Sequence, residues 1–299
     1  MKITKAVITA AGLSQRTLPL QGLVDVDGVG KSALQVLIEE VLDAGIQELC
    51  LVVHPGDQRA YSEAAGDYAS LIHWVEQTEP LGYAHALGLS RNFVDGEPFL
   101  HLLGDHLYLS RIPTRCARQL VQLAESESCS VSSVQATPES QLSYFGTVGG
   151  HRIPGRNRVY EINCILEKPS PTEAEQKIIV PGLRSGHYLC FFGMHVFTST
   201  FLDILVDECT HLPLEDQRCH SLADALNILV GRERYLAAEL EGRRFNVGAR
   251  YGLMFAQFAC ALAGSERDEI MRQLIELLAL NSPHRVRSSE EKSPPMQAS

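Results

Sequence analysis

Several polar segments of the chain follow directly after apolar runs, which is where open α/β sheets bind their ligands. One of them, Ala10-Ala11-Gly12-Leu13, follows the apolar run 5–10 and precedes Arg16. A glycine at the end of a strand lets backbone N–H groups approach a phosphate, and an arginine neutralises its charge. An ordinary strand-to-helix turn with a surface arginine has the same residues, so this segment alone is a weak indication of a phosphate site.

Two further segments of the first half suit a nucleotide and its metal ion. Gln77 and Gly82 flank a proline-containing turn. A glutamine amide offers a donor and an acceptor to a pyrimidine edge, and a glycine lets the backbone approach a base. Asp105 follows the apolar run 98–103. A carboxylate at the end of a buried strand suits Mg²⁺, which takes oxygen ligands and bridges phosphates.

The polar residues Glu167, Lys168 and Asn246 of the second half can each be interpreted as ligand-binding or as purely structural. Lys168 is able to hold a phosphate and Glu167 to accept from sugar hydroxyls, but an exposed ion pair is the alternative. Asn246 precedes an apolar helical stretch, so it is either a ligand or part of the N-terminal cap region of that helix.

The segment 28–32, Gly-Val-Gly-Lys-Ser, resembles the end of a phosphate-binding P-loop. The full motif requires a glycine five residues before Gly30, where this chain has Asp25, and no apolar strand leads directly into it. A nucleotide-hydrolysing P-loop protein that uses Lys31 and Ser32 is therefore a minor alternative.

Composition limits the compartment and the partners. The 299 residues are 45% hydrophobic and carry a net charge of -10, which opposes non-specific attraction to nucleic acid and to anionic membranes. No run approaches the length of about 18 apolar residues that a membrane span needs, and the start MKITKAVITAAG suits a strand better than a secretion signal. The 8 cysteines have no C-x-x-C spacing, so we expect core thiols rather than a zinc site or disulfides. A cytoplasmic protein without nucleic-acid or membrane partners is expected.

Apolar runs alternate with amphipathic stretches, which predicts an α/β domain with a mostly parallel sheet covered by helices. The turn signals within 144–168 predict antiparallel strands added to that sheet. A polar, proline-containing segment over 282–299 predicts a disordered tail after one folded domain, 1–281. The expected strands are 5–10, 48–53, 71–76, 98–103, 129–136, 187–197 and 234–239; the expected helices are 33–44, 57–66, 82–92, 114–127, 198–208, 220–230, 249–263 and 266–280.

Taken in chain order, these segments resemble the sugar-phosphate nucleotidyltransferases, most closely the bacterial UTP-glucose-1-phosphate uridylyltransferases. The likeness covers about residues 3–262 and depends on AAGLSQR, IEEVLDAGI, QTEPLGYAHA, LGDH, YFGTV, ILEKP, GMHVFTSTFLDIL and FNVG. It implies a Rossmann-like, GT-A-like nucleotidyltransferase fold with a mixed, mostly parallel sheet. The nucleotide-binding half would be about 1–110, the sugar-phosphate half about 111–263, and the C-terminal helix 266–280.

The resemblance also implies roles for individual residues. In this family Mg²⁺ is held by two aspartates, and a sugar 1-phosphate attacks the α-phosphorus of a nucleoside triphosphate. The implied nucleotide contacts are Ala10, Ala11, Gly12, Leu13, Arg16, Gln77 and Gly82; the sugar-phosphate contacts are Gly146, Glu167, Lys168 and Gly193; the metal positions are Asp105 and Asn246; and the catalytic residues are Arg16, Asp105 and Lys168.

Three departures from the family's pattern fall on these positions. Ser14-Gln15 replace the Gly-Thr of the family's G-x-G-T-R loop, residues 17–30 contain no lysine or arginine where the family has a Pro-Lys pair, and Asn246 replaces an aspartate. An amide ligates Mg²⁺ without adding charge, so metal affinity should fall. We therefore expect a weak enzyme.

The expected reaction is transfer from UTP or dTTP to a sugar 1-phosphate, in the first place glucose 1-phosphate. The alternative is a non-catalytic nucleotide-sugar binding or regulatory homologue. A purely structural scaffold would not explain why these polar residues follow the predicted strands. The resemblance leaves a homo-oligomer open.

Overall fold

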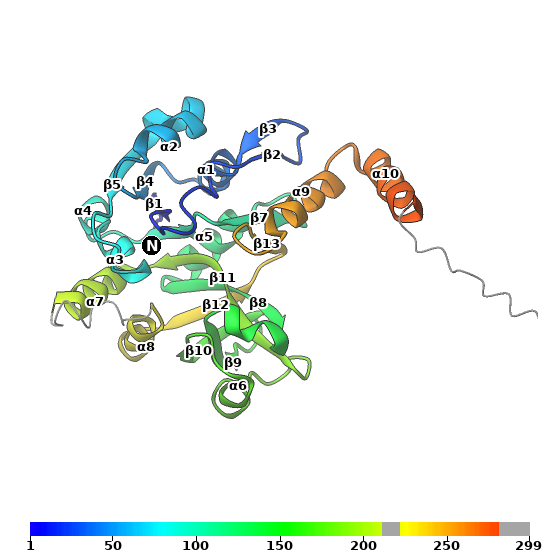
Figure 1. Ribbon diagram of the computed structural model, residues 1–299. Helices are drawn as coiled ribbons and strands as arrows, with labels where there is room; N and C mark the ends of the chain where they lie inside the picture. Colours follow the sequence, from blue (N-terminus) through cyan, green and yellow to red (C-terminus); the bar gives the residue numbers. More distant parts are fainter. Residues whose placement is uncertain (211–221, 281–299) are drawn as a thin grey trace, which may run out of the picture.

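The computed structural model describes residues 1–210 and 222–280, and its centre is one mixed sheet of nine strands. Its strands are β1 (Lys5–Thr9), β4 (Glu48–Val53), β5 (Ile72–Glu76), β6 (Phe99–Leu103), β8 (Ser130–Pro138), β9 (Thr147–Arg152), β10 (Val159–Leu166), β11 (His187–Phe197) and β12 (Tyr235–Glu239). Their order is β5-β4-β1-β6-β11-β8-β12-β10-β9 (Figure 1). Only β11 and β10 run against the other strands of this sheet, so the predicted mixed, mostly parallel arrangement is confirmed.

Two small sheets accompany the large one and were not expected from the sequence. β2 (Gly22–Val24) pairs with β3 (Gly30–Ser32), and β7 (His106–Ser110) pairs with β13 (Gly242–Asn246). These strands are short, and β3 and β13 are polar, so they lack the apolar runs that signal a strand.

Helices cover both faces of the large sheet (Figure 1). They are α1 (Ala33–Asp43), α2 (Gln58–Ala65), α3 (Tyr83–Gly88), α4 (Arg91–Val94), α5 (Cys116–Glu127), α6 (Pro171–Lys177), α7 (Ser199–Thr210), α8 (Leu222–Arg232), α9 (Gly252–Ala263) and α10 (Arg267–Leu280), with 3-10 turns η1 (Gly66–Leu71) and η2 (Glu139–Tyr144).

The helices differ from expectation at two places. The single helix expected over 82–92 is two short helices, α3 and α4, and between them the Ser90 hydroxyl donates to the Leu87 carbonyl oxygen at 2.7 Å. Such local side-chain bonds compete with a continuous helix. α6 was missed although Ser170, Pro171 and Glu173 form a capping box with proline at the start of the helix, which is a readable signal.

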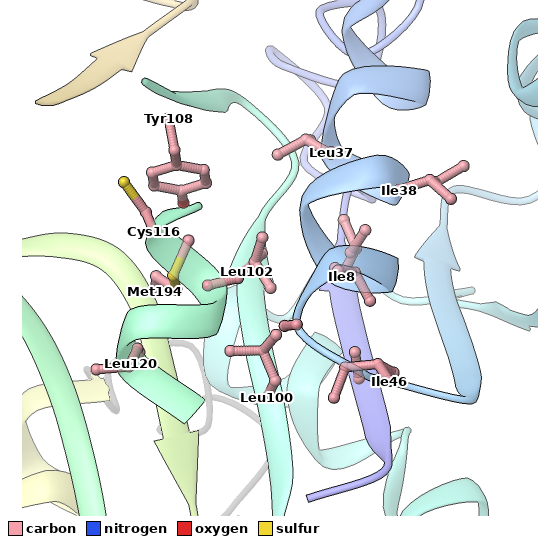
Figure 2. Close-up of a cluster of buried hydrophobic side chains, with 14 of the residues drawn as sticks. Ile8, Leu37, Ile38, Ile46, Leu100, Leu102, Tyr108, Cys116, Leu120 and Met194 are labelled. Atoms are coloured by element: carbon pink, nitrogen blue, oxygen red, sulfur yellow. The ribbon is translucent and has the colours of Figure 1, made fainter. Parts of the chain in front are cut away.

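Strand alternation divides the core into two layers. Ile8, Leu100, Leu102 and Met194 face α1 and α5 on one side of the sheet, where Figure 2 shows them packed with side chains such as Leu37. The neighbouring positions, among them Val7, Phe99 and Phe197, face α3, α7 and α8 on the other side. Because successive side chains of a strand point to opposite faces, one set of strands builds both cores.

α10 lies outside both cores. None of its residues is buried, and Figure 1 shows it beyond α9, away from the large sheet. The tail predicted over 282–299 lies outside the described residues. In the described parts of the chain, no helix has the length and apolarity to cross a membrane.

Candidate active site

A cavity of about 720 Å³ opens at the carboxyl ends of β1 and β6. This edge of a parallel sheet is where doubly wound proteins bind ligands. The predicted residues that line it are Ala10, Ala11, Gly12, Leu13, Gln77, Gly82, Asp105, Gly146, Glu167, Lys168, Gly193 and Asn246. The fold thus brings together residues from strand ends, from turns and, in the case of Gly193, from within β11, which are far apart in the sequence.

The Gln77 side chain fixes a turn in the part of the cavity that is predicted to hold the nucleotide. Its Nε2 donates to the Gly82 carbonyl oxygen at 3.0 Å and lies 3.0 Å from Nδ1 of His85. Burial lowers the pKa of His85, which favours the neutral ring that this contact needs. Gly82 has φ +105°, which glycine adopts without strain. With both amide protons used, Oε1 of Gln77 keeps its acceptor capacity, which the predicted contact to a base requires.

Asp105 and Asn246 both line the cavity where β7 and β13 pair, with Asn246 opposite His106 and Val247 opposite Asp105. The backbone N–H of Val247 donates to the Asp105 carbonyl oxygen at 2.8 Å, and Nδ1 of His106 donates to Oδ1 of Asp105 at 2.7 Å. Oδ1 of Asn246 accepts from the backbone N–H groups of Gly248 and Ala249. Asn246 therefore closes a local turn and is not the cap of α9, which begins at Gly252.

The donor set fits a magnesium ion that shares its ligands with a substrate. The described residues contain no group of three or more His, Cys, Asp or Glu side chains that could hold a metal ion. Mg²⁺ is commonly held by one or two carboxylates plus substrate phosphates, and the Asp105 carboxylate at the cavity satisfies that requirement. The Asn246 oxygen is already engaged by two backbone N–H groups.

Replacing Asn246 with aspartate is expected to lower the Mg²⁺ concentration for half-maximal activity by about tenfold, because it adds a charged ligand. One carboxylate oxygen would keep the bonds to Gly248 and Ala249 while the other faces the cavity. The measurement is pyrophosphate release titrated with Mg²⁺, with Asn92→Asp on the exposed surface as the charge control. An unchanged Mg²⁺ dependence would show that position 246 does not contact the metal.

Glu167, Lys168 and two glycines form one part of the cavity wall, which we call the sugar-phosphate end after the role predicted for these residues. Nζ of Lys168 lies 3.7 Å from Oε1 of Glu167, and both side chains are solvent-accessible. A Cβ atom on Gly146 would lie 2.9 Å from the Phe191 ring, and Gly193 has φ +86°. Gly146 lets the chain pass close to Glu167 and Phe191, and Gly193 lets it pass close to Leu103, Tyr108 and His106; a larger residue would be crowded at both positions.

Arg16 is the one predicted residue that does not line the cavity. Its Nη1 lies 2.8 Å from Nδ1 of His54 and 3.4 Å from Oδ2 of Asp57. The Tyr61 hydroxyl donates to the backbone carbonyl oxygen of Arg16 at 2.7 Å. A phosphate contact from Arg16 stays a prediction, and it would require the side chain to leave these partners.

The P-loop alternative is excluded by the surroundings of Lys31. Its ammonium group pairs with the carboxylates of Asp25, Asp27 and Glu39 at 2.7–2.9 Å, and Gly30–Ser32 form strand β3. Three carboxylates around the lysine leave no cationic cradle for a phosphate.

Two features near the cavity were missed from the sequence. His195 lines it, and burial lowers the pKa of His195 to about 3, so the ring is neutral and its Nδ1 contacts the Ser132 hydroxyl at 2.5 Å.

Arg244 lies on β13 with its guanidinium 3.6 Å from the centre of the Phe145 ring. Burial lowers the pKa of Arg244 to about 10, which leaves it charged at neutral pH. In the sequence it looks like half of an exposed Arg-Arg pair; only the alternation along β13 could have shown that it shares a face with Asn246.

A family model described as nucleotidyl transferase matches residues 5–242. The chain belongs to the nucleotidyl transferase family. It is 30% identical over 304 aligned residues to the UTP-glucose-1-phosphate uridylyltransferase YngB of Bacillus subtilis, covering 93% of this chain and 95% of that protein. It is 27% identical to a UTP-glucose-1-phosphate uridylyltransferase of Streptococcus pneumoniae, and the alignment covers 92% of this chain and 96% of that protein.

Solved structures of the family have the same fold. A UDP-glucose pyrophosphorylase from Acinetobacter baumannii superposes with a TM-score of 0.71 at 21% identity, covering 92% of this chain and 99% of that one. A glucose-1-phosphate thymidylyltransferase from Bacillus anthracis, described as putative, superposes with a TM-score of 0.62 at 18% identity. The superposition covers 89% of this chain and 96% of that one. The predicted resemblance and the nucleotidyltransferase fold are confirmed.

Proposed function

We propose that the protein transfers a nucleotidyl group from UTP or dTTP to a sugar 1-phosphate, preferentially glucose 1-phosphate, and releases pyrophosphate. The main support is that the side chains suited to a base, a metal ion and a sugar phosphate line one cavity. The uridylyltransferase names of the relatives support the choice of nucleotide and sugar.

The reaction needs little covalent chemistry from the protein. The phosphate oxygen of the sugar phosphate is already ionised at neutral pH, so no general base is required for its in-line attack on the α-phosphorus. Oε1 of Gln77 would accept the N3–H of uracil or thymine, and Lys168 would hold the sugar phosphate. Mg²⁺ bound at Asp105 would neutralise the charge of the phosphates. Catalysis then consists of positioning and charge compensation.

The non-catalytic alternative has specific support in this chain. Arg16 is engaged by His54 and Asp57, residues 17–30 supply no cation, and Asn246 has no charge. These features reduce the positive charge available to the triphosphate while the base and sugar ends of the cavity are kept. A binding or regulatory protein would show ligand affinity without turnover.

The test is pyrophosphate release by the purified protein with Mg²⁺, a panel of nucleoside triphosphates and a panel of sugar 1-phosphates. The proposal expects release with UTP or dTTP. Saturable binding of a nucleotide sugar without release would favour the non-catalytic alternative. If the protein shows no release and no binding, both functions are refuted.

We further propose a cytoplasmic location.

A homo-oligomer that uses α10 is also proposed. Met271 and Ile275, one turn apart on this helix, are 38% and 60% exposed, which is unusual for neighbouring apolar side chains of a free surface. Light scattering should give a mass above the 32.9 kDa of one chain. Met271→Glu combined with Ile275→Glu should shift the protein to monomers, whereas Arg267→Glu at the start of the helix should not. A monomeric wild type would contradict the proposal.

A further inference from the structure

Arg244 is a buried cation to which the described residues supply no anionic partner. Its residue is 7% exposed, and its Nη1 atom has no hydrogen-bond partner. Among the side chains that the structure describes, no carboxylate forms an ion pair with it. An unpaired charge inside a protein is strongly destabilising, so a ligand anion that this charge compensates is expected.

The charge lies directly behind the sugar-phosphate wall of the cavity. Arg244 and Asn246 are two residues apart on β13, so their side chains share a face, and Asn246 lines the cavity. The guanidinium stacks on Phe145, which also lines it. Opposite Arg244 on β7 is Tyr108, whose hydroxyl donates at 2.6 Å to the carbonyl oxygen of Gly193, another residue of the wall.

The cavity is poor in cations for a site that takes phosphates. Among the described residues that line it, Lys168 is the only lysine or arginine, and Arg16 is engaged outside it. A charge behind an apolar ring is little screened by water, so it acts on an anion in the cavity more strongly than a surface charge at the same distance.

We propose that Arg244 is a positioning residue whose unpaired charge stabilises the phosphate group bound at the sugar-phosphate end, acting through the Phe145 wall. This inference depends on the proposed function, because a phosphate-bearing ligand must occupy that end. The competing explanation is structural: the guanidinium only supports the Phe145 ring.

The test compares a charge-free variant, Arg244→Met, with the charge-retaining Arg244→Lys. The ligands are UDP-glucose or dTDP-glucose, whichever the wild type binds more tightly, and the matching nucleoside, which has no phosphate. Arg244→Met should weaken binding of the nucleotide sugar by about tenfold or more and leave nucleoside affinity unchanged. It should also keep or raise the melting temperature of the free protein, because it removes an unpaired buried charge. Arg244→Lys should bind the nucleotide sugar within a few-fold of the wild type.

The neighbouring Arg243→Met is the matched control, because Arg243 is exposed on the other face of β13. Equal losses for nucleotide sugar and nucleoside, or no loss in Arg244→Met, would overturn the inference while the wild type still binds. If Arg244→Met does not fold, Arg244→Gln replaces it; failure of both to fold would show a structural role and overturn the inference. A wild type that binds none of these ligands would refute the proposed function itself.

Discussion

Replacing Asp105 with asparagine is expected to lower kcat/KM for pyrophosphate release by about 10²–10³-fold, the loss typical of removing one main electrostatic contact to a reacting phosphate or oxyanion. Asp105 is the carboxylate at the paired ends of β7 and β13, and Asn246 beside it has no charge. The substitution would therefore remove the only charged ligand that Asp105 and Asn246 together offer to the metal ion. The amide oxygen is still able to accept from His106, so the fold should be kept.

The measurement is steady-state pyrophosphate release over a range of Mg²⁺ concentrations, with the melting temperature of each variant as the check on folding. Asp203→Asn is the control, because Asp203 lies in an exposed ion pair with Arg91. It removes the same charge from the molecule at a distance from the cavity. Wild-type rates in Asp105→Asn would place the metal ion elsewhere and overturn the proposed role of Asp105.

The cavity was predictable from the sequence largely because of one rule of sheet architecture. Gly12 and Asp105 follow buried apolar runs, Gln77 follows the partly exposed strand β5, and these parallel strands end at the same edge. Runs such as 48–53 are apolar at nearly every position because helices cover both faces, and this made the strands readable. Placing Gly146 and Gly193 needed the family resemblance, since a glycine in a strand has no local signal of its function.

Side-chain direction was the part that the sequence did not determine. Arg16 follows the nucleotide loop, yet a histidine and an aspartate from the next strand-helix unit hold it outside the cavity. Arg244 looks like a surface residue beside Arg243, yet its strand pairs with β7 and buries it. In both cases the deciding partners are distant in sequence, and β7 and β13 themselves were not predicted.

Phe197→Ala is expected to lower the free energy of unfolding by about 3–5 kcal/mol, the usual cost of emptying a large buried aromatic site. Phe197 is fully buried, and its ring centre lies 3.9 Å from that of Phe201, 5.1 Å from that of His195 and 5.9 Å from that of Phe99. Tertiary packing there is dense, so the cavity left by the ring should collapse only in part.

The measurement is chemical denaturation of the free protein, with Tyr144→Ala as the aromatic control. Tyr144 is 69% exposed, so its removal should change stability by no more than about 0.5 kcal/mol. A Phe197→Ala protein as stable as this control would show that the second core layer is not packed as described. Because His195 stacks on Phe197 and lines the cavity, the same substitution should also weaken nucleotide-sugar binding in the molecules that stay folded. Loss of stability without loss of affinity would mean that the sheet holds the cavity wall independently of the aromatic layer beneath it.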